Sequence, residues 1–293
     1  MATINELIQE INTNFPDNNE QLITAEKLRD TLIDMLYYGE EKPSEKHIHP
    51  TLFSQNLEAH KGYISAPENT IPAFKAAKDA GFKIIETEIV KSSDGVQFCL
   101  HDATIDRTSN GTGRADSYTA AQLKNFDFGS WRGSQWTGTK IPTLKEALLY
   151  CKRNGLCIEL DLTDDNRYDD SMLMGTYTVV KECGMLHQSI FCANSDRITK
   201  LQLIDPSVIV SISGATAITD TISTIIALSR FANVSIPAAN LTETLINNIH
   251  KANGYVKTFW YSDPTTETVT NVIAALDLGC DFAITSIVAP PDL

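Results

Sequence analysis

Two histidines and two glutamates lie close together in the sequence, on segments that are typical of strands and their ends. His60 lies in HKGYISAPENT, and His101 follows 41 residues later in HDATIDRTSNGTG. Glu86 and Glu88 lie between them in IETEIV. Two histidines can divide the general-base and general-acid roles of a hydrolysis between them. With neighbouring carboxylates, they predict metal-assisted chemistry on a phosphate ester.

Carboxylates recur at alternate positions of two strand candidates. Glu86 and Glu88 share one strand face, and Glu159 and Asp161 repeat the pattern in CIELDL. In a barrel interior such charges are costly unless they are paired or bind a metal. The alternative is that both glutamates of IETEIV point outward and the residues between them point inward. Clustered carboxylates favour one hard divalent cation, Mg²⁺ or Ca²⁺, with Asp161 as an additional candidate ligand.

The elements that must position these residues begin after a polar linker that ends near residue 50. Nine strand candidates follow, mostly alternating with helix-like segments: 57–63, 83–90, 96–102, 156–162, 189–194, 208–213, 233–237, 255–261 and 281–286. Strands that alternate with helices predict an α/β fold with a parallel sheet, and eight of them predict a (β/α)8 TIM-type barrel. Active sites of such barrels lie at the C-terminal ends of the strands.

The ninth strand candidate, 96–102, follows 83–90 too closely for a crossover helix. The connection KSSDG contains Asp94-Gly95, a hairpin turn signal. We therefore expect 96–102 to pair antiparallel with the second barrel strand. A turn centred near residues 93 and 94 sets Glu86 opposite His101.

A long insertion follows this hairpin. Residues 103–142 carry no strong apolar period and are rich in Gly, Ser, Thr and Asp. A loop of this length within a barrel is typical of a functional or inserted segment. The next stretch, PTLKEALLYCKRNG, predicts a helix that ends at Gly155.

The first 50 residues differ from the rest of the chain. Two short apolar stripes at helical spacing are followed by the polar linker GEEKPSEKHIHP. Two short amphipathic helices cannot bury their stripes alone, so they either pack on the barrel or associate with copies of themselves. We predict an N-terminal helical segment over 1–50, a barrel domain over 51–293, and a homo-oligomer formed through residues 1–40.

Composition narrows the function classes. The formal net charge of −13 disfavours nonspecific binding to nucleic acid or to an anionic membrane. The N-terminus lacks the pattern of a secretory signal, and no apolar run is long enough for a membrane span, so we expect cytoplasmic synthesis. Most of the six cysteines lie among apolar residues, which predicts buried reduced thiols.

Taken together, these motifs resemble the glycerophosphodiester phosphodiesterase family. The motifs that carry the resemblance are HKGYISAPENTIPAF, IETEIV, DGVQFCLHDATIDRTSNGTG, FGSWRG, IPTLKEAL and IELDL, in that order. The resemblance implies a TIM-type barrel that hydrolyses a phosphodiester with the help of a divalent metal. It implies that His60 and His101 are the acid/base pair. It also implies that Glu86, Glu88 and Glu159 are metal ligands.

The chain departs from the family pattern at four positions. The usual Arg after the first histidine is Lys61, which loses bidentate phosphate recognition. The usual second metal Asp is Glu88, and the usual Lys two residues after the third metal carboxylate is Asp161. Ser286 replaces the usual terminal Asp after Ile-Thr.

Three residues complete the expected site as substrate contacts: Lys61, Glu68 and Trp260. Glu68, in APENT, has an alternative role at the start of the first barrel helix, where it would complement the dipole. Trp260 is either a pocket wall or a core residue.

Residues 1–40 carry a second resemblance, to N-terminal attachment segments of tail or fibre proteins of phages that infect gut bacteria. It implies a trimeric stem that carries the barrel on a virion, with a glycerol-phosphate-containing surface polymer as substrate. Two alternatives to a glycerophosphodiester phosphodiesterase stay open. One is a phospholipase-D-like lipid hydrolase of the same superfamily, and the other is a non-catalytic receptor-binding barrel.

Overall fold

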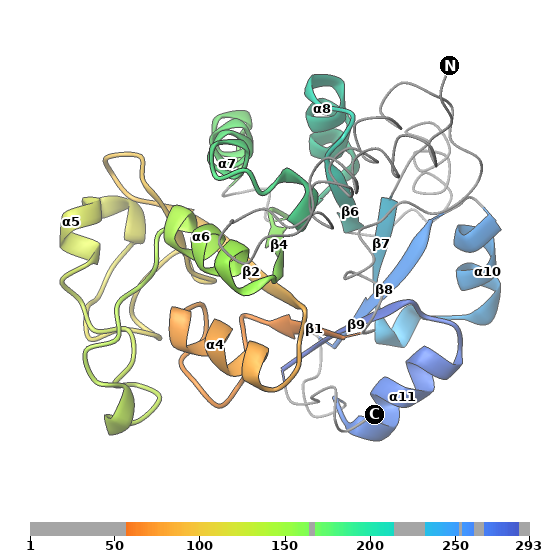
Figure 1. The fold of residues 1–293 in the computed structure, drawn as a ribbon, viewed down its shortest axis with the longest axis horizontal. Helices are drawn as coiled ribbons and strands as arrows, with labels where there is room; N and C mark the ends of the chain where they lie inside the picture. The colour runs from red at the N-terminus through yellow and green to blue at the C-terminus, as the bar shows by residue number, and fades with distance from the viewer. Residues whose placement is uncertain (1–56, 164–167, 214–231, 252–253, 261–266, 287–293) are drawn as a thin grey trace, which may run out of the picture. The chain divides into compact units, whose positions relative to one another are not determined.

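Eight parallel strands close into a barrel. The computed structural model describes residues 57–163, 168–213, 232–251, 254–260 and 267–286. The strands hydrogen-bond side by side in this order: β1 (Leu57–His60), β2 (Ile84–Lys91), β4 (Cys157–Asp161), β5 (Ser189–Ala193), β6 (Ile209–Ser213), β7 (Ala232–Pro237), β8 (Tyr255–Phe259) and β9 (Phe282–Thr285). Because β9 pairs in turn with β1, the sheet is closed (Figure 1). The predicted (β/α)8 class is confirmed.

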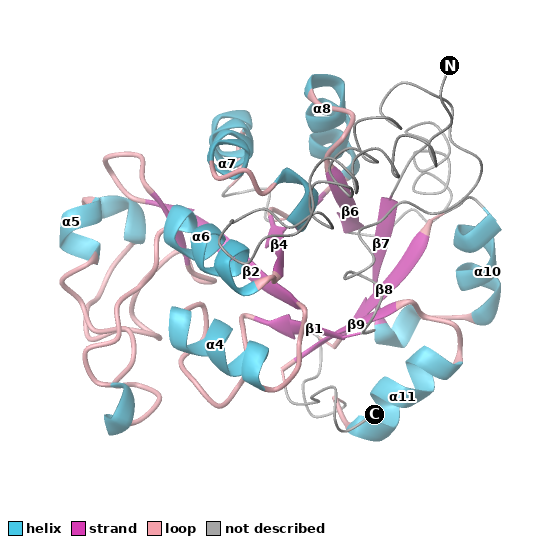
Figure 2. Cartoon of the chain, in the orientation of Figure 1, coloured by secondary structure: helices cyan, strands magenta, loops and turns pink. Residues whose placement is uncertain are grey.

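The described helices lie outside the barrel strands (Figure 2). The longer ones are α4 (Ile71–Asp79), α6 (Leu144–Asn154), α7 (Asp170–Glu182), α8 (Ser195–Ile204), α10 (Glu243–Lys251) and α11 (Val269–Asp277). Local sequence sets their ends. Thr143 and Glu146 form a capping box at the start of α6, and Gly155 ends it with φ +63° as predicted.

The ninth strand, β3 (Gln97–Cys99), pairs antiparallel with β2 as expected, but the predicted register was wrong by one residue. Ile89 lies opposite Cys99, and Lys91 lies opposite Gln97. The hairpin loop has three residues between Ser92 and Val96, with Gly95 at φ +87°, rather than a two-residue turn centred on 93 and 94. Leu100, not His101, therefore pairs with β2, through the Glu88 carbonyl at 3.0 Å.

The barrel interior changes from apolar to charged along the strands. An apolar cluster from six strands fills one level of the interior: Ile84, Cys157, Ile190, Ile209, Tyr255 and Phe282. Two residues further along three of these strands, on the same face, are Glu86, Glu159 and Lys257. All three are buried, so the apolar level supports a charged level nearer the C-terminal ends of the strands.

The insertion has an apolar cluster of its own. Residues 103–142 contain the short helix α5 (Ala120–Leu123), which lies to one side of the barrel (Figure 1). Ile105, Leu123, Phe128 and Ile141 pack there with apolar residues of the β2–β3 hairpin. The insertion is thereby attached to the end of β2, beside the predicted site.

The remaining predictions concern the N-terminal segment, the cysteines and membrane spans. The chain divides into two compact units, Met1–His47 and Ile48–Leu293. The predicted N-terminal helices and their oligomer lie outside the described residues and stay predictions. All six cysteines are buried and free, as predicted. Among the described residues, no helix has the length and apolar character of a membrane span.

Candidate active site

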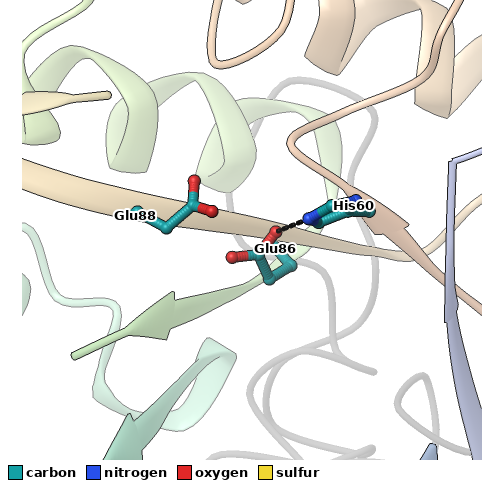
Figure 3. A group of neighbouring side chains, drawn as sticks. All are labelled: His60, Glu86 and Glu88. Atoms are coloured by element: carbon teal, nitrogen blue, oxygen red, sulfur yellow. Dashed lines mark ion pairs between the residues drawn. The ribbon is translucent and has the colours of Figure 1, made fainter. Parts of the chain in front are cut away.

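His60, Glu86 and Glu88 meet at the C-terminal end of β1 and in β2. One ligand atom from each lies within 4.8 Å of the others (Figure 3). His60 Nε2 is 4.0 Å from Glu86 Oε2. Both glutamates are buried inside the barrel, whereas Ile85 and Ile89 pack in the core between strands and helices. The interpretation in which the glutamates point outward was therefore wrong.

The Glu86 carboxylate has the surroundings of a cation ligand. Its Oε2 accepts a hydrogen bond from the Lys61 backbone N–H at 3.1 Å. Its Oε1 is buried, and the described residues offer it no hydrogen bond. Burial, reinforced by the Glu88 and Asp161 carboxylates, holds the pKa of Glu86 well above its usual value. Two buried carboxylates with an imidazole beside them fit a divalent cation, whose charge would relieve this repulsion.

His60 presents a neutral imidazole to the site. Its Nδ1 lies 2.8 Å from Ser286 Oγ, at the end of β9. Burial, together with the positive charges of Lys61 and His101, lowers the pKa of His60 to about 3. The ring is therefore unprotonated at neutral pH, as both a general base and a metal ligand require.

His101 faces the same cluster from the loop after β3. Its Nδ1 lies 2.5 Å from Asp102 Oδ1, and its Nε2 lies 3.8 Å from Glu88 Oε1. Its Nε2 thus faces Glu88, whereas the predicted hairpin register set His101 opposite Glu86. The ring is 44% exposed, so a substrate can reach it.

Lys61 lies between the glutamates of the site. It has φ +58°, and its Nζ is 3.6 Å from Glu88 Oε1 and 4.0 Å from Glu68 Oε1. The adjacent Gly62 is needed for packing: a Cβ there would lie 2.7 Å from the Cβ of Ala73 in α4. Close approach of that helix therefore excludes a larger residue.

Glu159 and Asp161 lie on β4, directly beside β2. In the parallel register Glu159 is the partner of Glu86, and Asp161 is the partner of Glu88. Glu159 forms a buried ion pair with Lys257 of β8, and it lies outside the group of three potential ligands described above. Asp161 is half-buried and accepts a hydrogen bond from the Thr163 N–H at 2.9 Å.

Trp260 follows β8 and packs in the main hydrophobic core, where it is 8% exposed. Along this strand Lys257 and Phe259 point into the barrel, so Trp260 is on the opposite face. This placement favours the core-packing alternative over a pocket wall.

Residues 60–285 match the Glycerophosphoryl diester phosphodiesterase family. The chain belongs to this family. A glycerophosphodiester phosphodiesterase from Caldanaerobacter subterraneus is 42% identical over 89 residues, covering 30% of this chain and 37% of that protein. Mouse glycerophosphodiester phosphodiesterase 1 is 31% identical over 159 residues, covering 53% and 47%. The chain spans less than half the length of these curated relatives.

A solved structure shares the fold. A phosphodiesterase from Oleispira antarctica, in complex with the product sn-glycerol-3-phosphate, aligns with a TM-score of 0.67 and 24% identity. The alignment covers 80% of this chain and 94% of that chain. At this identity the likeness establishes the common barrel of the family.

In this family member, Arg107 connects two loops at the site, and our sequence analysis missed it. Its guanidinium donates two hydrogen bonds to Glu68, at 2.8 and 2.7 Å, and two to Asp102, at 2.7 and 3.1 Å. Burial raises the pKa of Asp102, but hydrogen bonds from Arg107 and His101 outweigh it and lower that pKa to about 2. Glu68 therefore binds Arg107 rather than the start of α4, which Thr70 caps.

Asn69 is a second residue that the sequence analysis did not single out for this site. It adopts φ +56°, and its Nδ2 donates to Glu88 Oε2 at 3.0 Å. Its Oδ1 accepts a hydrogen bond from Thr87 Oγ1 at 2.6 Å. Asn69 thus holds one oxygen of Glu88, and the other oxygen lies near Lys61 and His101. An Asn in a turn before a helix is the only sequence signal for this role.

Replacing Arg107 with methionine is expected to lower kcat about 10- to 100-fold, because the Asp102–His101 pair and Glu68 lose the group that fixes them. The matched control is Arg114→Met, which breaks an exposed ion pair with Asp116 in the same insertion. Steady-state kinetics on glycerophosphocholine measures both variants. Equal losses in the two variants would contradict a positioning role for Arg107.

Proposed function

We propose that this chain is a divalent-metal-dependent phosphodiesterase that hydrolyses a glycerophosphodiester to an alcohol and glycerol 3-phosphate. The observation that carries the proposal is the junction of His60, Glu86 and Glu88, with His101 3.8 Å from Glu88. The family match over residues 60–285 supports the same reaction class.

The cation would be held by Glu86 and Glu88, with Glu159 beside them. Bound there, it would neutralise charge on a phosphoryl oxygen. The ammonium group of Lys61, whose Nζ lies near Glu88, is placed to contact a phosphate oxygen. A lysine gives a point charge where an arginine would give a bidentate contact, so phosphate orientation depends more on the metal site.

The two histidines divide the proton transfers. His60 is unprotonated and lies deep in the site, so it accepts the proton of the attacking hydroxyl, from water or from the substrate itself. His101 is more exposed, and Asp102 holds its Nδ1, so its Nε2 is directed toward the leaving alcohol, to which it donates a proton.

The direct test is hydrolysis of glycerophosphocholine and bis-p-nitrophenyl phosphate with Mg²⁺, Ca²⁺ or EDTA. We expect release of product with a divalent cation, loss of release in EDTA, and loss in His60→Ala. A non-catalytic receptor-binding barrel predicts no metal-dependent release from either compound. A phospholipase-D-like hydrolase predicts turnover of intact phospholipid in preference to glycerophosphocholine.

The pH dependence tests the role of His60. Since the pKa of His60 is about 3, a general base at this ring places the acidic limb of kcat/KM near pH 3. Ser286→Asp places a carboxylate at Nδ1 and stabilises the imidazolium, so the pKa rises and the acidic limb moves up by about one to two pH units. Ser286→Asn, which adds no charge, is the control. An unmoved limb in Ser286→Asp contradicts the general-base assignment.

Residues 1–40 supply the part of the proposal that concerns the natural substrate and its location. The sequence resemblance of residues 1–40 is the sole basis for two proposals. One is that the substrate is a glycerol-phosphate-containing surface polymer, and the other is that this segment attaches the chain to a virion. The predicted trimer rests on the same segment.

A further inference from the structure

Lys257 is a fully buried lysine for which the proposed reaction has given no role. Its ammonium donates to Glu159 Oε1 and lies 3.6 Å from Glu58 Oε2. These three groups come from β8, β4 and β1, so the cluster spans the barrel interior. Each side chain is at most 1% exposed. A buried ammonium between two carboxylates is costly to maintain, which makes a role for it worth seeking.

Glu159 and Glu86 have the same pattern of contacts. They are register partners on the adjacent strands β4 and β2. In each carboxylate one oxygen is held by a donor: Glu86 Oε2 by the Lys61 N–H, and Glu159 Oε1 by Lys257. The second oxygen of each is buried, and the described part of the chain gives it no hydrogen bond. Figure 3 shows the corresponding arrangement at Glu86, with one oxygen toward His60 and the other pointing away from it.

A buried carboxylate oxygen without a donor is costly unless a cation occupies the space beside it. Groups that hold the second oxygen of a ligating carboxylate fix its orientation and thereby the affinity of the site. Among the described residues, Lys257 is the cation that contacts Glu159. Asp161, two residues beyond Glu159 on the same strand face, is an anion and cannot take this role.

We propose that Lys257 is a positioning residue for the cation site: it holds Glu159 Oε1 and thereby directs Glu159 Oε2 to the cation bound by Glu86 and Glu88. The inference rests on the proposed metal-dependent function. It makes Glu159 a ligand whose orientation is set from β8, across the barrel, rather than by a neighbour on its own strand.

The test is Mn²⁺ affinity, measured by isothermal titration calorimetry on the full chain. Lys257→Met alone leaves two buried carboxylates without their cation and can fail to fold. The informative variant is therefore Glu58→Gln/Lys257→Met, which removes one anion together with the cation. We expect it to bind Mn²⁺ about 10- to 100-fold more weakly than the wild type. Glu58→Gln alone, the matched control, is expected to stay within about twofold.

A second set of variants tests whether Lys257 acts through Glu159. Glu159→Gln is expected to weaken Mn²⁺ binding about as much as the first double variant, and adding Lys257→Met to it is expected to change affinity by no more than about twofold. This pair also removes one anion with the cation, so it remains informative if the first double variant does not fold.

Two results would overturn the inference. One is Mn²⁺ binding by Glu58→Gln/Lys257→Met that equals or exceeds that of the wild type, which would mean that Lys257 only balances charge or competes with the cation for Glu159. The other is a further tenfold loss when Lys257→Met is added to Glu159→Gln. A wild-type chain that binds no Mn²⁺ refutes the proposed function itself, and is distinguishable because every variant then behaves alike.

Discussion

Glu86→Gln is expected to weaken divalent-cation binding by at least about 100-fold, with a parallel loss of hydrolysis. The substitution keeps the size of the side chain and removes the charge of the most deeply buried carboxylate of the His60–Glu86–Glu88 group. An amide oxygen is a weaker ligand for a hard cation than a carboxylate oxygen. Calorimetric titration with Mg²⁺ and Mn²⁺ gives the affinity, and the release of glycerol 3-phosphate gives the rate.

The stability of the same variant separates ligand loss from misfolding. Burial and the neighbouring carboxylates raise the pKa of Glu86, so in EDTA at neutral pH the ionised side chain opposes folding. Glu86→Gln is therefore expected to unfold in EDTA at a temperature equal to or above that of the wild type. It should also lose the rise in melting temperature that a bound cation gives.

The control for Glu86→Gln is Glu182→Gln, an exposed carboxylate-to-amide change on α7. It should alter neither binding nor rate. A Glu86→Gln variant that retains metal-dependent stabilisation would contradict the ligand assignment.

His101→Gln is the second change with a large expected effect. Loss of a general acid lowers kcat about 10²- to 10⁴-fold. Metal affinity is expected to change little, because His101 lies outside the group of three potential ligands. His187→Gln, at an exposed position beside β5, is the matched control and should retain full activity.

The choice of substrate shows which proton transfer His101 performs. p-Nitrophenolate is a far better leaving group than an aliphatic alkoxide and needs little help from a general acid. His101→Gln should therefore lose much less activity on bis-p-nitrophenyl phosphate than on glycerophosphocholine. A similar loss on both substrates would assign His101 to activation of the nucleophile instead.

The architecture was readable from the sequence because strand and helix signals are local. Eight strand candidates and one hairpin return were each found within a few residues of their observed positions. The hairpin register was not readable, because a three-residue loop and a two-residue turn share the same Asp94-Gly95 signal. With the observed register Leu100 lies opposite Glu88, and the His101 ring reaches Glu88 from the loop after β3.

The sequence predicted which carboxylates share a face in the candidate site, and the tertiary structure determined their partners. Alternation along a strand determined that Glu86 and Glu88 share a face, and closure of the barrel made that face the interior. The partners of these carboxylates depend on contacts between distant segments. Arg107 reaches Glu68 across 39 residues, and Lys257 reaches Glu159 across 98.

The sequence by itself determined the barrel, the family motifs and the identity of the chemical groups, because periodicity and spacing are properties of neighbouring residues. The tertiary structure alone decided which oxygen of Glu86 and of Glu159 receives a hydrogen bond and which does not. That choice depends on groups from distant segments, the Lys61 backbone N–H at Glu86 and the Lys257 ammonium at Glu159, which only the folded barrel brings within hydrogen-bond distance.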